Sequence, residues 1–140
     1  MVEIRQGRPA DHPTLRTIQK QTLAEPSPEL LGTAVHGPPE LLVADDGEPI
    51  GYTLFIAGNE EAILLEIAVA PPRQGNGIGS TLITETCLYL DELCIERVRL
   101  TAHAADDRAK QFYKRHGFES EDYLTGYFES GDAVLFSRDI

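Results

Sequence analysis

The chain has 140 residues and a formal net charge of −11, with 41% hydrophobic and 25% charged residues. This composition fits one globular domain over residues 1–140 and excludes a disordered chain. No apolar run approaches the ~20 residues that a membrane-spanning helix needs. The negative charge argues against nucleic acid as a partner, because phosphate contacts need a basic face.

The N-terminal half predicts one strand, two helices and three further strands. Val2 and Ile4 alternate with polar residues, which indicates the first strand. Asp11 and Ser27 stand where side-chain oxygens cap helices, each followed closely by a proline. Strands are expected at residues 40–44, 49–56 and 61–69, the first two joined by the hairpin turn Asp45-Asp46-Gly47-Glu48.

The C-terminal half predicts two helices and three strands. Apolar residues keep a helical period from Ile78 onwards, and Val98 and Leu100 mark a strand. A short helix around Phe112 is expected to stop before Gly117, a residue suited to the left-handed turn after a helix. The last strands are expected near 118–123 and 132–138. The order β-α-α-β-β-β-α-β-α-β-β describes a mixed α+β domain with one central sheet.

The stretch Gln74-Gly75-Asn76-Gly77-Ile78-Gly79 joins the strand at 61–69 to the helix that begins at Ile78. A strand, a glycine-rich turn and a helix together direct backbone N–H groups at a phosphate. A Walker A loop is excluded because Gly79-Ser80-Thr81 has no Lys. A dinucleotide fingerprint is disfavoured, because Ser80 occupies its third glycine position.

The pattern Q/R-x-x-G-x-G/A fits Gln74, Gly77 and Gly79, and with it the chain resembles the GNAT superfamily of N-acetyltransferases. The stretch from Val69 to Gly79 resembles the acetyl-CoA pyrophosphate loop of that family. Independently, residues 109–118 (AKQFYKRHGF) resemble its A-x-x-(L/F)-Y-x-x-x-G-F motif. The ending at residues 126–133 (GYFESGDA) more loosely resembles the ribosomal-protein N-terminal alanine acetyltransferases.

The resemblance implies a central, mostly antiparallel sheet of six to seven strands flanked by about four helices. It implies acetyl-CoA as cosubstrate and no metal. Asp106 stands where many relatives carry an Asn that contacts CoA, and its alternative role is a helix N-cap. Arg73 is either a cationic contact or a solvated surface residue. The implied contacts to acetyl-CoA come from Ile67, Ala68, Val69, Gln74, Gly75, Asn76, Gly77, Ile78, Gly79, Ser80 and Asp106.

The resemblance also implies the catalytic acid, Tyr113. Acetyl transfer to an amine expels a thiolate, and a phenol with a pKa of about 10 can protonate a thiol with a pKa of about 8.5. The alternative is a packed aromatic residue. The base stays open between Glu66, His103 and a water chain, because Thr101 stands where related enzymes often carry Glu or His.

These observations predict an acetyl-CoA-dependent N-acetyltransferase in which a primary amine attacks the thioester directly. The acceptor is a protein N-terminus or a small amine, and the alternative is a non-catalytic acyl-CoA-binding module on the same fold. We expect no nucleic-acid or membrane partner, and leave open whether the chain forms a homodimer. The acidic clusters are either an ordinary solvated surface or an adaptation to high salt.

The sequence also predicts a cytoplasmic protein. The N-terminus lacks the apolar core of a signal peptide. Cys87 and Cys94 lie seven positions apart in what reads as one helix, about 10 Å at 1.5 Å per residue, too far for a disulfide. We expect both to be buried thiols.

Overall fold

The computed structural model describes residues 1–140, which form a single seven-stranded sheet in the order β1-β2-β3-β4-β5-β7-β6. Every neighbouring pair is antiparallel except β4 and β5, which are parallel. The predicted order of elements and the mostly antiparallel sheet are confirmed. The strands are β1 Glu3–Gln6, β2 Glu40–Asp45, β3 Pro49–Ala57, β4 Glu61–Val69, β5 Arg97–His103, β6 Glu119–Phe128 and β7 Gly131–Asp139.

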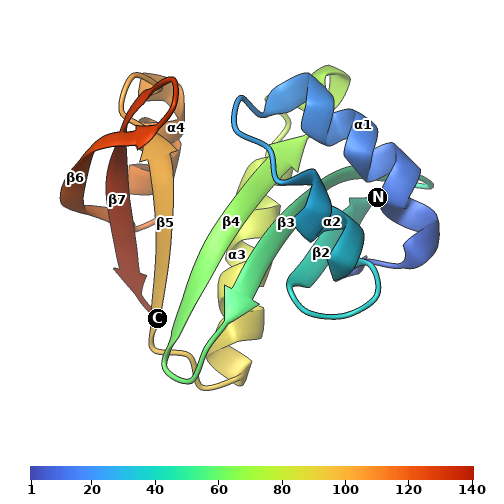
Figure 1. Ribbon diagram of the computed structural model, residues 1–140. Helices are drawn as coiled ribbons and strands as arrows, with labels where there is room; N and C mark the ends of the chain where they lie inside the picture. Colours follow the sequence, from blue (N-terminus) through green and yellow to red (C-terminus); the bar gives the residue numbers. More distant parts are fainter.

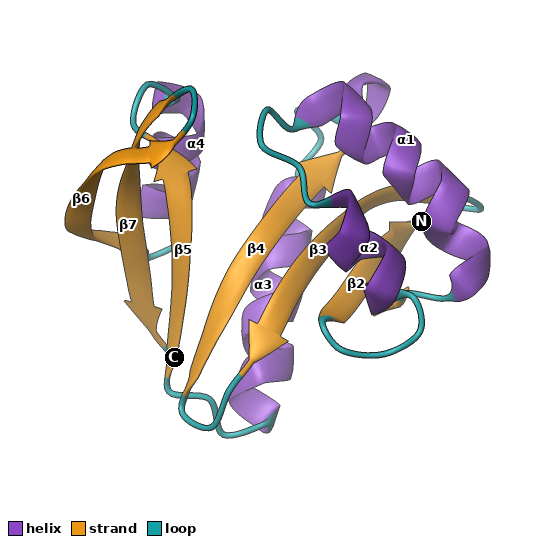
Figure 2. Cartoon of the chain, viewed as in Figure 1, coloured by secondary structure: helices purple, strands orange, loops and turns teal.

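Two helices cover each face of the sheet (Figures 1 and 2). The helices α1 and α2 pack against the sheet through a hydrophobic cluster that contains Leu15, Leu31 and Tyr52. The helices α3 and α4 pack against the other face through a cluster that contains Ile83, Tyr113 and Phe136. No helix is long and apolar enough to cross a membrane. The helices are α1 His12–Thr22 and α2 Pro28–Ala34 on one face, and α3 Ile78–Glu92 and α4 Asp107–Arg115 on the other, with short 3₁₀ turns η1 Pro9–Asp11 and η2 Pro71–Arg73.

The parallel strands β4 and β5 pair only at their beginnings. Their register runs from Glu61 opposite Arg97 to Ile63 opposite Arg99, with no pairing beyond. Figure 1 shows the two strands together at the bottom of the view and diverging toward their arrowheads. The C-terminal halves of both strands therefore keep backbone groups that no neighbouring strand satisfies.

An irregularity in β4 accompanies this divergence. The β3 partner changes from Leu54 opposite Glu66 to Phe55 opposite Leu64, so Leu65 is an extra residue on β4. A bulge of this kind bends its strand and re-aims the side chains that follow. As a result Leu64 joins the core on the α3 side, whereas Glu66 faces α1.

Three local predictions are wrong. Asp11 and Ser27 do occupy N-cap positions, but neither side chain caps its helix. The Asp11 carboxylate instead accepts bonds from the Arg5 guanidinium at 2.8 Å and from the Arg8 N–H at 2.7 Å, and a charged guanidinium is a stronger partner than a helix N–H. Cys94 is exposed rather than buried, because α3 ends at Glu92 and Cys94 takes φ 63° in the following turn.

Candidate active site

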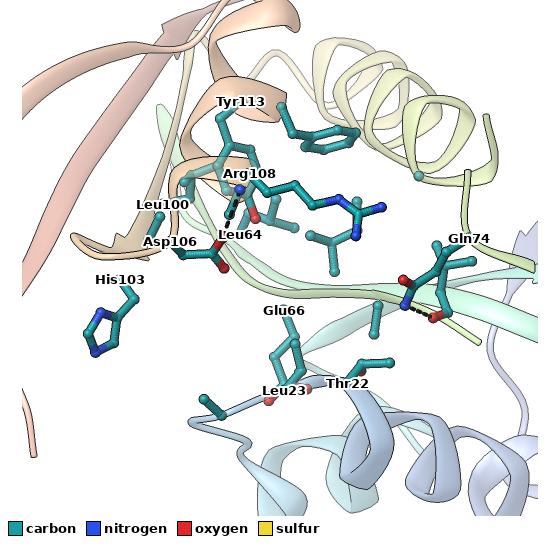
Figure 3. Close-up of a pocket in the computed structure, with 18 of the residues that line it drawn as sticks. Thr22, Leu23, Leu64, Glu66, Gln74, Leu100, His103, Asp106, Arg108 and Tyr113 are labelled. Carbon is teal, nitrogen blue, oxygen red and sulfur yellow. Dashed lines mark hydrogen bonds between the residues drawn. The ribbon is translucent and has the colours of Figure 1, made fainter. Parts of the chain in front are cut away.

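A cavity of about 630 Å³ lies where β4 and β5 diverge. Its walls come from both strands, from the glycine-rich loop and the start of α3, from α4, and from the segment that follows α1 (Figure 3). Figure 3 places Gln74 at one end and His103 at the other, with Tyr113 and Glu66 on opposite sides between them. We call the Gln74 end the loop end and the His103 end the hairpin end, because β6 and β7 approach there.

All but one of the residues expected to bind the cosubstrate or to catalyse line this cavity. The exception is Asn76, whose amide donates to the Arg73 carbonyl at 3.2 Å within the loop itself. The Gln74 amide likewise donates to the Val69 carbonyl at 2.9 Å. These two side chains therefore fix the shape of the loop.

The glycine-rich loop needs glycine at two positions. Gly75 and Gly77 take φ values of 82° and 81°, a left-handed conformation that side chains other than glycine rarely adopt. Gly77 also directly precedes the first helical residue, Ile78. The chain thus turns sharply from η2 into α3, and the helix begins at the wall of the cavity.

The most distinctive property of the loop end is a run of backbone donors without acceptors. The N–H groups of residues 75 to 80 find no hydrogen-bond acceptor in the protein, and the first bond in this part of α3 joins the Thr81 N–H to the Gly77 carbonyl. The positive end of the α3 dipole lies at the same place. Because unpaired N–H groups and a helix N-terminus both favour negative charge, the loop end suits an anion.

Three arginines line the cavity of this acidic protein: Arg73, Arg108 and Arg115. Arg73 forms an ion pair with Asp46, and this contact holds the Asp46 pKa below its usual value. The guanidinium of Arg115 lies 5.8 Å from the Phe112 ring centroid. Arg108 is exposed, forms no ion pair, and extends into the cavity in Figure 3. Arg108 therefore carries an uncompensated positive charge at the cavity wall.

The segment Ile67-Ala68-Val69 forms one wall beside the loop. Its other edge pairs with β3, where Tyr52 lies opposite Ala68. Beyond Ile63 the edge that faces β5 has no strand partner. Backbone groups on this edge are available to an extended ligand that carries amides.

Tyr113 projects from α4 into the middle of the cavity (Figure 3). Its side chain is buried among Phe112, Phe118 and Phe136, with ring centroids 5.5 to 6.0 Å away. Burial, and then the negative charge of Asp106, raise its pKa above the ordinary value. The phenol therefore stays protonated at neutral pH and can donate a proton.

Asp106 caps α4. Its carboxylate accepts the Ala109 N–H at 3.0 Å, so the helix-capping alternative weighed from the sequence is present in the structure. Asp106 also lines the cavity. The cap fixes the first turn of α4, which carries Arg108, and leads to the turn that carries Tyr113.

Glu66 is buried and accepts three hydrogen bonds. Oε1 accepts from the Gln19 amide at 2.8 Å and from the Tyr52 hydroxyl at 2.9 Å, and Oε2 accepts from the Ser27 N–H at 2.7 Å. In Figure 3 the side chain runs from β4 toward the end of α1. A carboxylate has about four lone-pair positions, so this set leaves about one free.

The hairpin end is crossed by a chain of hydrogen bonds. Ser130, in the turn between β6 and β7, donates to the Glu25 carboxylate at 2.6 Å. Its hydroxyl oxygen also lies 3.1 Å from His103 Nε2, while the Ala105 N–H donates to Nδ1 at 3.4 Å. Because Nδ1 accepts, the proton of the neutral ring belongs on Nε2, which donates to Ser130.

The His103 ring also stacks on Phe128, with ring centroids 5.5 Å apart and planes 6° from parallel. Thr101, two residues before His103 on β5, also lines the cavity and has no ionisable group. No group of three or more His, Cys, Asp or Glu side chains is placed to hold a metal ion.

Sequence reasoning did not identify Arg108, Glu25 or Ser130. Arg108 has a local signal, since it directly precedes Ala109, the first residue of the second family motif. Glu25 and Ser130 have none, because they are 105 positions apart and meet only through the fold.

Residues 5–118 match the model of the acetyltransferase (GNAT) family. An uncharacterized N-acetyltransferase of Methanocaldococcus jannaschii is 28% identical over 140 residues, covering 96% of this chain and 90% of the relative. A second uncharacterized N-acetyltransferase of that organism is 32% identical over 89 residues. That match covers 59% of this chain but 39% of the relative, so the chain spans about two fifths of its length.

Solved structures share the fold over their whole length. Ard1 from Thermoplasma volcanium has a TM-score of 0.91 and 26% identity, covering 99% of this chain and 97% of that one. The ribosomal-protein-S18-alanine N-acetyltransferase from Escherichia coli has a TM-score of 0.89 and 22% identity, covering 100% and 94%. A GNAT family acetyltransferase from Elizabethkingia anophelis with acetyl-CoA bound has a TM-score of 0.86 and 21% identity, covering 99% and 98%.

Proposed function

This chain belongs to the GNAT acetyltransferase family, and on that premise we propose that it moves an acetyl group from acetyl-CoA to a primary amine of a protein N-terminus or a small molecule. The observation that carries the proposal is the run of unpaired N–H groups at residues 75 to 80, which shares one cavity with Tyr113. A diphosphate and a thioester are the two parts of acetyl-CoA that these features suit.

The loop end fits the pyrophosphate of the cosubstrate. Successive N–H groups and the α3 dipole stabilise its negative charge, and Arg108 adds a free cation at the same wall. Arg73 can join only by leaving Asp46. The amide-bearing arm then runs along the unpaired edge of Ile67-Ala68-Val69, where a backbone N–H can polarise the thioester carbonyl.

In the reaction the amine attacks the thioester carbonyl and the carbon–sulfur bond breaks, which expels the CoA thiolate. Tyr113 donates its proton to that thiolate. Its buried phenol, with a raised pKa, is protonated when needed. No covalent intermediate with the protein is required, and no cysteine lines the cavity.

The amine must also lose a proton, for which Glu66 is the proposed acceptor. One lone-pair position remains free on its carboxylate, and it lines the cavity across from Tyr113. We propose that a bound water carries the proton to it. His103 is the second candidate, but both of its ring nitrogens already form hydrogen bonds, so it must first give up the Ala105 contact.

The test is release of free thiol from acetyl-CoA in the presence of N-terminal peptides of varied sequence and of small amines. Turnover with at least one acceptor, slowed at least about 10-fold in Tyr113→Phe, supports the proposal. Tight CoA binding without turnover on any acceptor supports a non-catalytic acyl-CoA-binding module instead. The peptide and small-amine arms separate the two acceptor classes.

The role of Glu66 is tested by the pH dependence of the rate in Glu66→Gln. If Glu66 is the base, the limb of the wild-type profile that rises with pH disappears or shifts in the variant. If the variant keeps that limb unchanged, Glu66 is not the base. The same profile is measured for His103→Gln. If the rising limb is lost in that variant and kept in Glu66→Gln, His103 is the base.

A further inference from the structure

Behind the first turn of α3, the His116 ring contacts Ser80. Ser80 Oγ and His116 Nε2 are 3.0 Å apart. Ser80 lines the cavity, and its backbone N–H is the last of the six unpaired N–H groups. His116 follows α4 and does not line the cavity. The contact therefore links the end of α4 to the anion-binding end of α3 without itself meeting the ligand.

Phe112 holds the His116 ring in place. The two ring centroids are 4.7 Å apart, and Phe112 ring atoms would lie 3.5 Å from a Cβ at Gly79. Helix α4 thus rests on the first turn of α3 at two adjacent points, Phe112 on Gly79 and His116 on Ser80. A ring held this way keeps Nε2 directed at the Ser80 hydroxyl.

We propose that His116 is a positioning residue that sets the direction of the Ser80 hydroxyl hydrogen and so couples its own protonation to binding of the pyrophosphate. The inference rests on the proposed function of the loop. When the neutral ring carries its proton on Nδ1, Nε2 is bare, the Ser80 O–H donates to it, and the oxygen lone pairs face the cavity and repel an anion. When the ring is an imidazolium, Nε2 always carries a proton and donates to Ser80 Oγ, which leaves the hydroxyl free to donate to a phosphate oxygen.

The charges around the ring fit a switch of this kind. The charged groups that act on it are Arg115 on its own helix and Arg138 on β7, and from α3 it faces the uncharged Ser80. Burial, then these two arginines, lower the His116 pKa, so the ring is neutral in the free protein near pH 7. A diphosphate at residues 75 to 80 adds negative charge beyond Ser80 and favours the imidazolium. Binding is therefore expected to draw up to one proton from solvent onto the ring, with affinity rising as pH falls through the His116 pKa of the complex.

The experiment measures binding of dephospho-CoA. This ligand keeps the pyrophosphate but lacks the ribose 3′-phosphate, whose own protonation would change with pH. Calorimetry in buffers of different ionisation enthalpy should show proton uptake on binding to the wild-type protein. His116→Gln should remove that uptake and flatten the pH dependence of the Kd. His36→Gln, an exposed histidine outside the cavity, is the matched control and should change neither.

Ser80→Ala provides a readout that a purely structural role of His116 would not move. The loss of affinity for dephospho-CoA should be about 10-fold at about pH 6, where the hydroxyl donates to a charged group, and clearly smaller at about pH 8. Pantetheine, which has no pyrophosphate, should bind with no proton uptake. Equal losses at both pH values, or uptake that persists in His116→Gln, would overturn the inference.

A nuclear magnetic resonance titration of the His116 ring in the wild-type protein covers the case in which a variant does not fold. The ring pKa should rise when dephospho-CoA is added, and an unchanged pKa contradicts the inference. If dephospho-CoA does not bind the wild-type protein at all, the proposed function of the loop fails and the inference fails with it. Binding without proton uptake leaves the proposed function standing and removes only the inference.

Discussion

The two ends of the cavity treat their hydrogen-bonding groups in opposite ways. At the loop end, the N–H groups of residues 75 to 80 have no acceptor in the protein. At the hairpin end, Ser130 is bonded to both Glu25 and His103, and between the two ends Glu66 accepts three bonds. One end therefore presents unmet backbone donors, whereas the polar side chains of the other already satisfy themselves.

This difference indicates how each end recognises its ligand. A ligand at the loop end forms bonds without breaking any within the protein, which favours an anion there. An acceptor at the hairpin end must displace or extend existing bonds, so only a molecule that replaces them binds well. We propose that the loop end supplies affinity for the donor and that the hairpin end selects among acceptors.

The largest expected effect comes from removing the Glu66 carboxylate, which accepts three bonds between the two ends. Glu66→Ala leaves the Gln19 amide, the Tyr52 hydroxyl and the Ser27 N–H without an acceptor. We expect the free energy of unfolding to fall by about 3 kcal/mol or more, because bonds to charged groups contribute about 1.5 to 3 kcal/mol each. Chemical denaturation measures it, with Glu61→Ala, at the exposed start of the same strand, as control. Equal losses in both variants would show that the Glu66 bonds add little stability.

Tyr113→Phe removes the proposed acid between the two ends and leaves both intact. We expect kcat to fall at least about 10-fold, within the range of general-acid contributions, with the Kd for CoA unchanged. Steady-state thiol release and calorimetry measure the two quantities. Tyr127→Phe, an exposed tyrosine on β6, should behave like wild type. A kcat that stays the same in Tyr113→Phe removes Tyr113 from the chemical step.

Gly77→Ala disturbs the loop end through the backbone alone. A Cβ at Gly77 meets no atom within 4 Å, so the cost is the left-handed φ of 81°, about 1 to 2 kcal/mol. We expect the Kd for CoA to rise about 5-fold or more. Gly47→Ala in the β2–β3 turn, at φ 87° and equally unobstructed, is the matched control. If both variants lose stability and neither loses affinity, the loop shape is not what binds CoA.

Ser130→Ala breaks the chain of bonds across the hairpin end and is expected to have the smallest effect. The variant removes the bond to the Glu25 carboxylate and the bond with His103, and because both are exposed to solvent we expect the KM for the acceptor to change only about 2- to 10-fold while the Kd for CoA stays constant. Ser120→Ala on the exposed part of β6 is the control. An altered Kd for CoA would show that the two ends are not independent.

The same difference explains what the sequence could reveal. The strand boundaries of β4 and the start of α3 match the prediction because apolar periodicity and glycine are local signals. The loop end was predictable because the spacing of its glycines indicates a turn that exposes backbone N–H groups. The bonds of Glu66 and of the hairpin end were not, because they join residues 39 and 105 positions apart, Ser27 to Glu66 and Ser130 to Glu25.

The two wrong helix caps differ in origin. Asp11 and Ser27 are both good capping residues by type, but only the Asp11 side chain has another partner in the structure. Asp11 binds Arg5 across the β1–α1 connection, and the Ser27 N–H binds the Glu66 carboxylate. The Arg5 guanidinium is a stronger partner for the Asp11 carboxylate than a helix N–H. The Ser27 bond engages only the backbone N–H, so nothing in the structure explains why its hydroxyl does not cap α2.

The divergence of β4 and β5 has a consequence for the protein's behaviour in a crowded solution. A strand edge with unpaired backbone groups normally invites other chains to add to the sheet, and proteins protect their outer edges against such aggregation. Here the open edges lie in the middle of the sheet, inside a cavity of about 630 Å³ that α1, α3 and α4 border. The unpaired backbone groups of these edges can therefore bind a ligand, but only one slender enough to enter the cavity.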